Sequence, residues 1–107
     1  MFEKNLLLPY LLDIYGSLLS ERKKELLDYY YGEDYSLSEI SELTGISRQG
    51  VRDSIKKSEA ELLDIEDKLR LFEKRKKAES LIHEAKSLAE GNTALTAVLD
   101  ALEEAAT

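Results

Sequence analysis

The side chains best suited to chemistry in this sequence are basic and amide groups gathered within about ten positions. They are Ser47, Arg48, Gln49, Arg52, Lys56 and Lys57. Residues spaced four apart share one face of a helix, so this set would present one polar surface. Arginine and glutamine are common readers of guanine and adenine edges, and lysine contacts phosphate. From Ile46 to Ser58 the local charge is +3, with four basic residues and one acidic residue, Asp53. The chemistry this surface favours is recognition of nucleic acid.

The residues before and within this stretch predict two short helices joined by a tight turn. Ser36 and Glu39 have the spacing of a capping box, which starts a helix. Gly45 would end that helix in a left-handed conformation, and Ser47 would cap the next one. The pattern is that of a helix-turn-helix. The side chains expected to bury the two helices against each other are Ile40, Leu43, Ile46, Val51 and Ile55.

The charge around this motif opposes the nucleic-acid interpretation. The whole chain has a formal charge of −7, and residues 20–45 contain seven acidic residues against three basic ones. Affinity for duplexes depends largely on neutralising phosphates. The alternative is therefore that the basic residues are solvated side chains on an amphipathic helix. Both interpretations remain open from the sequence.

Composition limits the fold and the class of function. The 107 residues are 43% apolar and 35% charged, with one proline, and they predict an all-α protein. The absence of cysteine excludes disulfides and thiolate chemistry. The N-terminal apolar run is short and contains Pro9, so it is unlike a signal peptide, and no window approaches a membrane span. We expect a soluble cytoplasmic protein.

A pair of helices is expected before the motif. The first covers about residues 4–18, with Pro9 either in its first turn or at a kink. The second begins after the cap Ser20 and runs to about Tyr31. We assign residues 1–60 to a helix-turn-helix domain without a winged element, and residues 61–107 to a long helical extension.

Two leucine-rich stripes follow one another in the extension. The first is Leu62, Ile65, Leu69 and Phe72, which resembles a coiled-coil seam. The second is Leu81, Leu88, Leu95 and Leu102. The stripes are out of register, which predicts a break near 74–78, and Gly91-Asn92-Thr93 predicts a second break at 91–93. A continuous zipper with Asn92 at its interface is the alternative. The seam, together with the N-terminal Leu/Tyr face, predicts a homodimer.

Three further groups of residues have a functional and a structural interpretation. The cluster Lys74, Arg75, Lys76 and Lys77 would contact RNA or an acidic partner, or would be a solvated hinge. Tyr29, Tyr30, Tyr31 and Tyr35 would stack on bases or, more consistently with their helical spacing, pack in the core. His83 lies on a polar stretch and is expected at the surface. No catalytic constellation, metal site or cofactor motif is present in the pattern, so we expect no enzyme.

The sequence resembles two known groups of proteins. The segments Glu39-Ile40, Gly45-Ile46-Ser47 and Val51-Arg52 are similar to region 4 of bacterial sigma factors. Together with the segments 11–20, 30–37 and 55–59, they resemble the YlxM family of small helix-turn-helix proteins. The likeness covers about residues 6–77. Gly50 and Arg52 depart from the family's usual alanine and aromatic residue.

The resemblance implies an accessory or regulatory role in the signal recognition particle pathway, because genes of that family lie beside the gene for the particle's GTPase. The partners it implies are the particle's RNA or its GTPase. The alternatives are a transcription regulator that binds duplex DNA through Arg48, Gln49 and Arg52, and a helical scaffold that binds only protein.

Overall fold

The computed structural model describes residues 4–106, which form helices and turns without a strand. The elements in order are α1 (Leu8–Tyr15), the 3-10 turn η1 (Gly16–Leu18), α2 (Glu21–Leu27), the π-helical turn η2 (Asp28–Gly32), α3 (Leu37–Thr44), α4 (Arg48–Leu69), α5 (Leu71–Leu88) and α6 (Thr93–Ala106). The all-α prediction is confirmed. The chain divides into two compact units, one ending at Leu69 and one beginning at Arg70.

The first two helices are shorter than the sequence pattern predicts. Pro9 lies in the first turn of α1, where a backbone N–H would have no partner within the helix. Its missing N–H therefore costs no hydrogen bond, and Pro9 starts the helix without kinking it. Ser20 caps α2 as expected, its Oγ accepting a hydrogen bond from the N–H of Lys23 at 3.3 Å. The helix expected to reach Tyr31 changes at Asp28 into the π-helical turn η2.

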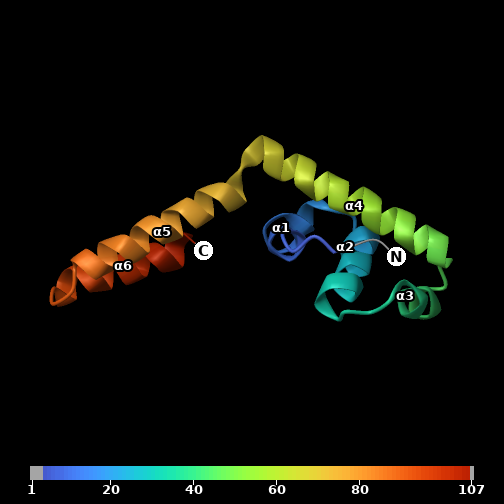
Figure 1. Ribbon diagram of the computed structural model, residues 1–107, viewed down its shortest axis with the longest axis horizontal. Coiled ribbons are helices and arrows are strands. Elements are labelled where there is room, and N and C mark those ends of the chain that lie inside the picture. The colour runs from blue at the N-terminus through green and yellow to red at the C-terminus, as the bar shows by residue number, and fades with distance from the viewer. Residues whose placement is uncertain (1–3, 107) are drawn as a thin grey trace. The chain divides into compact units, whose positions relative to one another are not determined.

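The core of the first unit forms where α4 crosses the three preceding helices (Figure 1). At the crossing, Ser58 is fully buried, and its Oγ donates to the carbonyl of Ser54 at 2.8 Å. Burial of each large aliphatic side chain stabilises the fold by about 1.5–3 kcal/mol. The fully buried large side chains are Leu8, Leu11, Tyr15, Leu26, Leu27, Tyr30, Ile40, Val51, Ile55 and Leu62.

Acidic side chains of α4 make three bonds to the helices beneath it. The Tyr15 hydroxyl donates to Glu66 Oε1 at 2.6 Å, and the Tyr31 hydroxyl donates to Glu59. Lys23 pairs with Glu61 at 3.2 Å. Three of the carboxylates that follow the helix-turn-helix motif are therefore engaged in contacts within the first unit.

These contacts correct the predicted domain boundary and the predicted coiled-coil seam. The first unit extends to Leu69 rather than to residue 60, because Leu62 is fully buried and Glu66 bonds to α1. Leu62 therefore cannot join a seam with a second chain, and the seam Leu62–Phe72 is not one continuous helix, since α4 ends before Phe72. Half of the N-terminal Leu/Tyr face assigned to the same dimer is also internal, with Leu8, Leu11 and Tyr15 at most 1% exposed, whereas Leu18 is 64% exposed.

The first break in the extension lies at Arg70, not at 74–78. Arg70 has a φ of 56°, a left-handed conformation that interrupts a right-handed helix. Its guanidinium pairs with Glu73 at 2.7 Å in the first turn of α5. Residues 74–77 lie within α5, because lysine and arginine are good helix formers and do not end a helix by themselves. The basic run is therefore no hinge.

The second unit is a hairpin of α5 and α6, which run antiparallel beside each other (Figure 1). Gly91 has a φ of 88°, and Asn92 caps α6 through a 3.0 Å hydrogen bond from the N–H of Leu95. The chain therefore turns at 91–93, and Asn92 is a cap rather than part of a zipper. Ile82, Ala89 and Leu99 are the buried apolar side chains of this unit.

Replacing Gly45 with alanine tests the backbone requirement of the turn before α4. Its φ of 77° costs an L-residue about 1–2 kcal/mol, so Gly45→Ala should lower the free energy of unfolding by that amount. Urea denaturation followed by circular dichroism measures the change. The control is Gly32→Ala, where an added Cβ meets no atom within 4 Å and φ is not positive. Equal stability of the two variants would contradict this account.

Candidate nucleic-acid interface

Local hydrogen bonds fix the beginning and end of α3. The Ser36 Oγ accepts from the N–H of Glu39 at 3.1 Å, and the Glu39 carboxylate accepts from the N–H of Ser36 at 3.1 Å. This is the predicted capping box. Gly45 ends the helix in the left-handed conformation, with its N–H donating to the carbonyl of Ser41 at 2.9 Å.

Side chains of α3 also bind the turn that leads to α4. The Ser41 hydroxyl donates to the carbonyl of Ile46 at 2.5 Å. The Thr44 hydroxyl donates to the carbonyl of Ile40 at 2.8 Å and accepts from the N–H of Ile46 at 3.3 Å. These hydrogen bonds hold the turn against the end of α3, and the turn in turn fixes the direction in which α4 begins.

Ser47 and Gly50 form the first turn of α4. The Ser47 Oγ accepts from the N–H of Gly50 at 3.0 Å, so Ser47 serves as the predicted cap. A Cβ on Gly50 would lie 2.9 Å from Cγ2 of Ile46 and 3.0 Å from that Oγ. Glycine therefore allows the turn to pack closely on the start of α4.

The predicted base-reading residues share the outer surface of α4. Arg48 and Gln49 are exposed in its first turn, and Arg52 is half-buried one turn later. Lys56 and Lys57 are exposed in the following turn. We call Arg48, Gln49, Arg52, Lys56 and Lys57 the basic face.

An acidic residue lies within the basic face. The Gln49 side-chain amide donates to Asp53 Oδ1 at 2.9 Å, and Asp53 is exposed. Gln49 must therefore release this bond, or use its remaining donor and acceptor, to read a base edge. The arrangement suits phosphate and guanine contacts from the arginines better than adenine recognition by Gln49.

Leu43 was expected in the core of the motif, and this expectation is wrong. Its side chain is 59% exposed, whereas Ile40, Val51 and Ile55 are fully buried. Helix α3 buries Leu37 and Ile40, whereas Leu43 lies one turn after Ile40, near the C-terminal end of the helix, where its side chain meets solvent. The three-residue spacing places Leu43 next to Ile40 on the helix surface, but it does not show where the neighbouring helices stop covering that surface.

The second basic cluster belongs to the second unit. Lys74, Arg75, Lys76 and Lys77 all lie on α5. Arg75 is half-buried, and the Lys76 ammonium lies 5.6 Å from the centroid of the Phe72 ring. The four residues point around the helix rather than towards one surface, because consecutive positions are about a quarter turn apart.

The tyrosines near η2 are engaged with one another. Tyr30 is 2% exposed and meets Tyr31 edge-on, with ring centroids 5.2 Å apart. Tyr29 and Tyr35 stack at 5.8 Å, and the carboxylate of Glu25 raises the pKa of Tyr29. Burial agrees with the packing interpretation for Tyr30, whereas Tyr29, Tyr31 and Tyr35 are half-buried and contact a neighbouring tyrosine ring.

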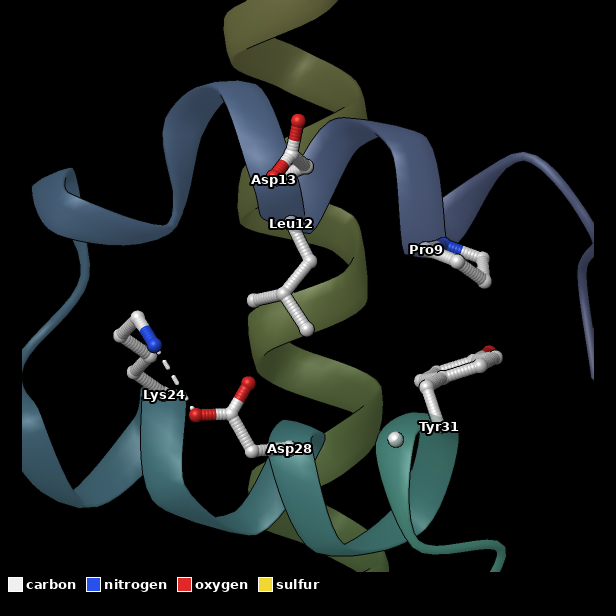
Figure 2. Close-up of a pocket in the computed structure, with 7 residues that line it drawn as sticks. Pro9, Leu12, Asp13, Lys24, Asp28 and Tyr31 are labelled. Atoms are coloured by element: carbon white, nitrogen blue, oxygen red, sulfur yellow. Dashed lines mark hydrogen bonds and ion pairs between the residues drawn. The ribbon is translucent and has the colours of Figure 1, made fainter.

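A separate concavity of about 430 Å³ opens between α1 and the α2–η2 segment. Figure 2 shows Pro9, Leu12 and Asp13 on one side and Lys24, Asp28 and Tyr31 on the other. Lys24 already pairs with Asp28 at 2.9 Å, so the charges of the cavity are partly satisfied within it. It has no adjacent nucleophile and base, and residues 4–106 contain no group of three side chains suited to a metal.

His83 lies beside a second open cavity on the hairpin. The cavity measures about 460 Å³ and its other lining residues are Glu79, Asp100, Glu103 and Glu104. Lys86 pairs with Asp100 at 2.7 Å and with Glu103 at 3.1 Å, and these bonds raise its pKa. His83 is exposed, as expected from its polar surroundings.

Comparison with known proteins identifies the family. The family described as "Putative helix-turn-helix protein, YlxM / p13 like" matches residues 2–102. The chain belongs to this family. The UPF0122 protein YlxM of Bacillus subtilis (strain 168) is 40% identical over 105 residues, which are 95% of this chain and 96% of that protein. A relative from Bacillus velezensis is 41% identical over the same share of each chain.

The likeness is stronger over a shorter length in a clostridial relative. The UPF0122 protein of Clostridium kluyveri is 49% identical over 77 residues, covering 72% of this chain and 69% of that protein. The family is one of helix-turn-helix proteins and not an enzyme family. Within the described residues, no helix is both long and apolar enough to cross a membrane.

The bond between Tyr31 and Glu59 can be followed by alkaline titration. Burial and this bond raise the pKa of Tyr31 above its usual value near 10. The resulting stabilisation is present below the unfolded pKa and is lost as pH rises through the folded pKa. Glu59→Gln should therefore lower the pKa of Tyr31, measured by phenolate absorbance, and reduce stability below pH 10. Glu84→Gln, on the hairpin, is the control and should change neither; an unchanged titration in Glu59→Gln would disprove the assignment.

Proposed function

We propose that this protein is a regulatory nucleic-acid-binding protein that contacts its target through the basic face of α4. The observation that supports this is the partition of charge along one helix. In the N-terminal half, Arg48, Lys56 and Lys57 are exposed and Arg52 is half-buried. In the C-terminal half, Glu59, Glu61 and Glu66 bond to tyrosine and lysine within the unit.

This partition reduces the repulsion expected from the net charge of −7. A carboxylate that accepts a bond from a phenol or an ammonium is held beside the core, away from the surface at the start of α4. Coulomb interactions between exposed charges fall off over about 8 Å at physiological ionic strength. The nearby charges are then those of the basic face, with Asp53 and the exposed acids of α3, Glu39 and Glu42, against them.

Those acidic residues favour a target that needs few phosphate contacts. A tight duplex-binding protein neutralises many phosphates, and this motif offers at most four cations in its basic face. A structured RNA within a ribonucleoprotein suits such a surface, because shape and other proteins add to the affinity. The resemblance to the YlxM family leads us to propose the RNA or the GTPase of the signal recognition particle as the partner. The second proposal is a transcription regulator that reads promoter DNA with Arg48 and Arg52.

Substitution of the basic face tests both proposals. Arg48→Ala and Arg52→Ala should each weaken binding at least tenfold and lower the salt slope by about one ion. Fluorescence anisotropy over a salt series measures both quantities. Lys68→Ala is the control, since Lys68 lies at the other end of α4 and pairs with Asp64. Wild-type affinity in both arginine variants, with unchanged circular dichroism, would disprove the use of this face.

Three ligands in the same assay separate the candidate partners. Binding to the particle's RNA or to its GTPase, with weak binding to genomic duplex, would support the role in that pathway. Duplex binding with a slope of several ions would support the transcription regulator. Binding to the GTPase that Arg48→Ala leaves intact would instead favour a protein-binding scaffold.

A further inference from the structure

The hairpin of the second unit has two chemically different faces. One contains His83, Glu79 and Asp100, which line a common cavity with Glu103 and Glu104. The other contains large apolar side chains that are 44–84% exposed. They are Leu81 and Leu88 on α5 and Leu95, Val98 and Leu102 on α6, and we call this set the leucine face.

Helix geometry places these five residues on one side of the hairpin. Ile82 of α5 and Leu99 of α6 point between the helices, at 5% and 9% exposure. In two antiparallel helices, residues one position after the inward residue lie on one side of the pair, and those one position before lie on the other. His83 and Asp100 follow the inward residues and line one cavity. Leu81 and Val98 precede the inward residues, so they lie together on the opposite side. That side is extended by Leu88, seven residues after Leu81, and by Leu95 and Leu102, three before and four after Val98.

The leucine face has the size of an interaction surface. Its exposed area is on the order of 600 Å², the upper end of the range for the largest apolar patch of a monomer, and patches of that size are often functional. The described residues of this unit bury only Ile82, Ala89 and Leu99, whereas stable units of this size need a larger core or a partner. Lys74 and Lys77 precede Leu81 by seven and four residues on α5, so the leucine face ends beside two exposed lysines.

We propose that a second copy of this chain covers the leucine face and that the two hairpins form an antiparallel four-helix bundle. In a twofold dimer the same surface of each copy forms the interface, so a residue that contacts a second residue of the partner must itself be contacted by that second residue's counterpart. An axis midway between Leu81 and Leu88 places each of these residues opposite the other in the second copy. Leu95 and Leu102 exchange in the same way.

A single axis satisfies both pairs. We take His83 of α5 and Asp100 of α6, which line one cavity, as lying at about the same level of the hairpin. The midpoint of Leu81 and Leu88 is one and a half residues beyond His83. The midpoint of Leu95 and Leu102 is one and a half residues before Asp100, which is the same level because the helices are antiparallel. Val98 then lies at the axis and meets its own counterpart.

The remaining dimensions also fit a second copy. Two leucine faces would bury about 1,200 Å² in total, the lower limit of a standard specific interface. Exposed alanines at positions 101 and 105 of α6 allow a neighbouring helix to approach closely. This surface replaces the predicted seam Leu62–Phe72 as the site of self-association.

Oligomeric mass tests the proposal directly. Light scattering after gel filtration should give twice the 12.2 kDa of one chain, and Leu88→Glu should reduce the mass to that of one chain. Leu88 is 84% exposed, so this variant should keep its helical content by circular dichroism. Leu43→Glu is the matched control, since Leu43 is an exposed leucine of the first unit, and it should remain dimeric. A wild-type monomer at micromolar concentration, or a Leu88→Glu dimer, would overturn the proposal.

Single cysteines test the position of the axis, because the chain has none of its own. Val98→Cys should form a disulfide-linked dimer under mild oxidation, since the two residues meet at the axis. His83→Cys, on the opposite face, should remain monomeric on a denaturing gel. Equal crosslinking of both variants would overturn the bundle geometry. Self-association through the hairpin does not involve the basic face of α4. Arg48→Ala should therefore dimerise like the wild type.

Discussion

The packing of α4 on the three preceding helices is the constraint on which the first unit depends. Val51, Ile55, Ser58 and Leu62 follow one another at three- and four-residue spacing and are all fully buried. The serine among them is small and satisfies its own hydroxyl within the helix, so the helices can approach closely. Because this stripe faces inward along about three turns, the opposite side of α4 must face outward. The basic face is the exposed counterpart of the core.

The same helix separates two uses of charge. In its first half, cations stand at the surface beside a turn that hydrogen bonds hold rigid. In its second half, carboxylates accept bonds from Tyr15, Tyr31 and Lys23. Net charge alone describes neither half. A formal charge of −7 therefore gives little information about what the N-terminal half of α4 contacts.

The accuracy of the sequence predictions depends on the range of the interaction involved. The capping box of Ser36 and Glu39, the left-handed Gly45 and the cap Ser47 were all predictable, since each is a bond between residues at most three or four positions apart. The break at Arg70 was placed too late. Arg70 is not one of the residues that favour the left-handed conformation, which are glycine, asparagine and aspartate, so no local signal in the sequence marks the break.

The sequence by itself determined the helices, the helix-turn-helix and the residues available to its outer surface. Those features follow from helix propensity, capping and spacing, which are local. Only the tertiary structure decided which apolar residues are used internally. Leu62 is buried against the N-terminal helices while Leu43 is exposed, although both lie in favourable helical patterns. It also showed that Ile82, Ala89 and Leu99 form the hairpin core and that the leucines spaced by seven remain outside it. A small unit can bury only some of its apolar side chains, and which ones it buries depends on how the helices pack. A periodic pattern within one helix does not contain that information.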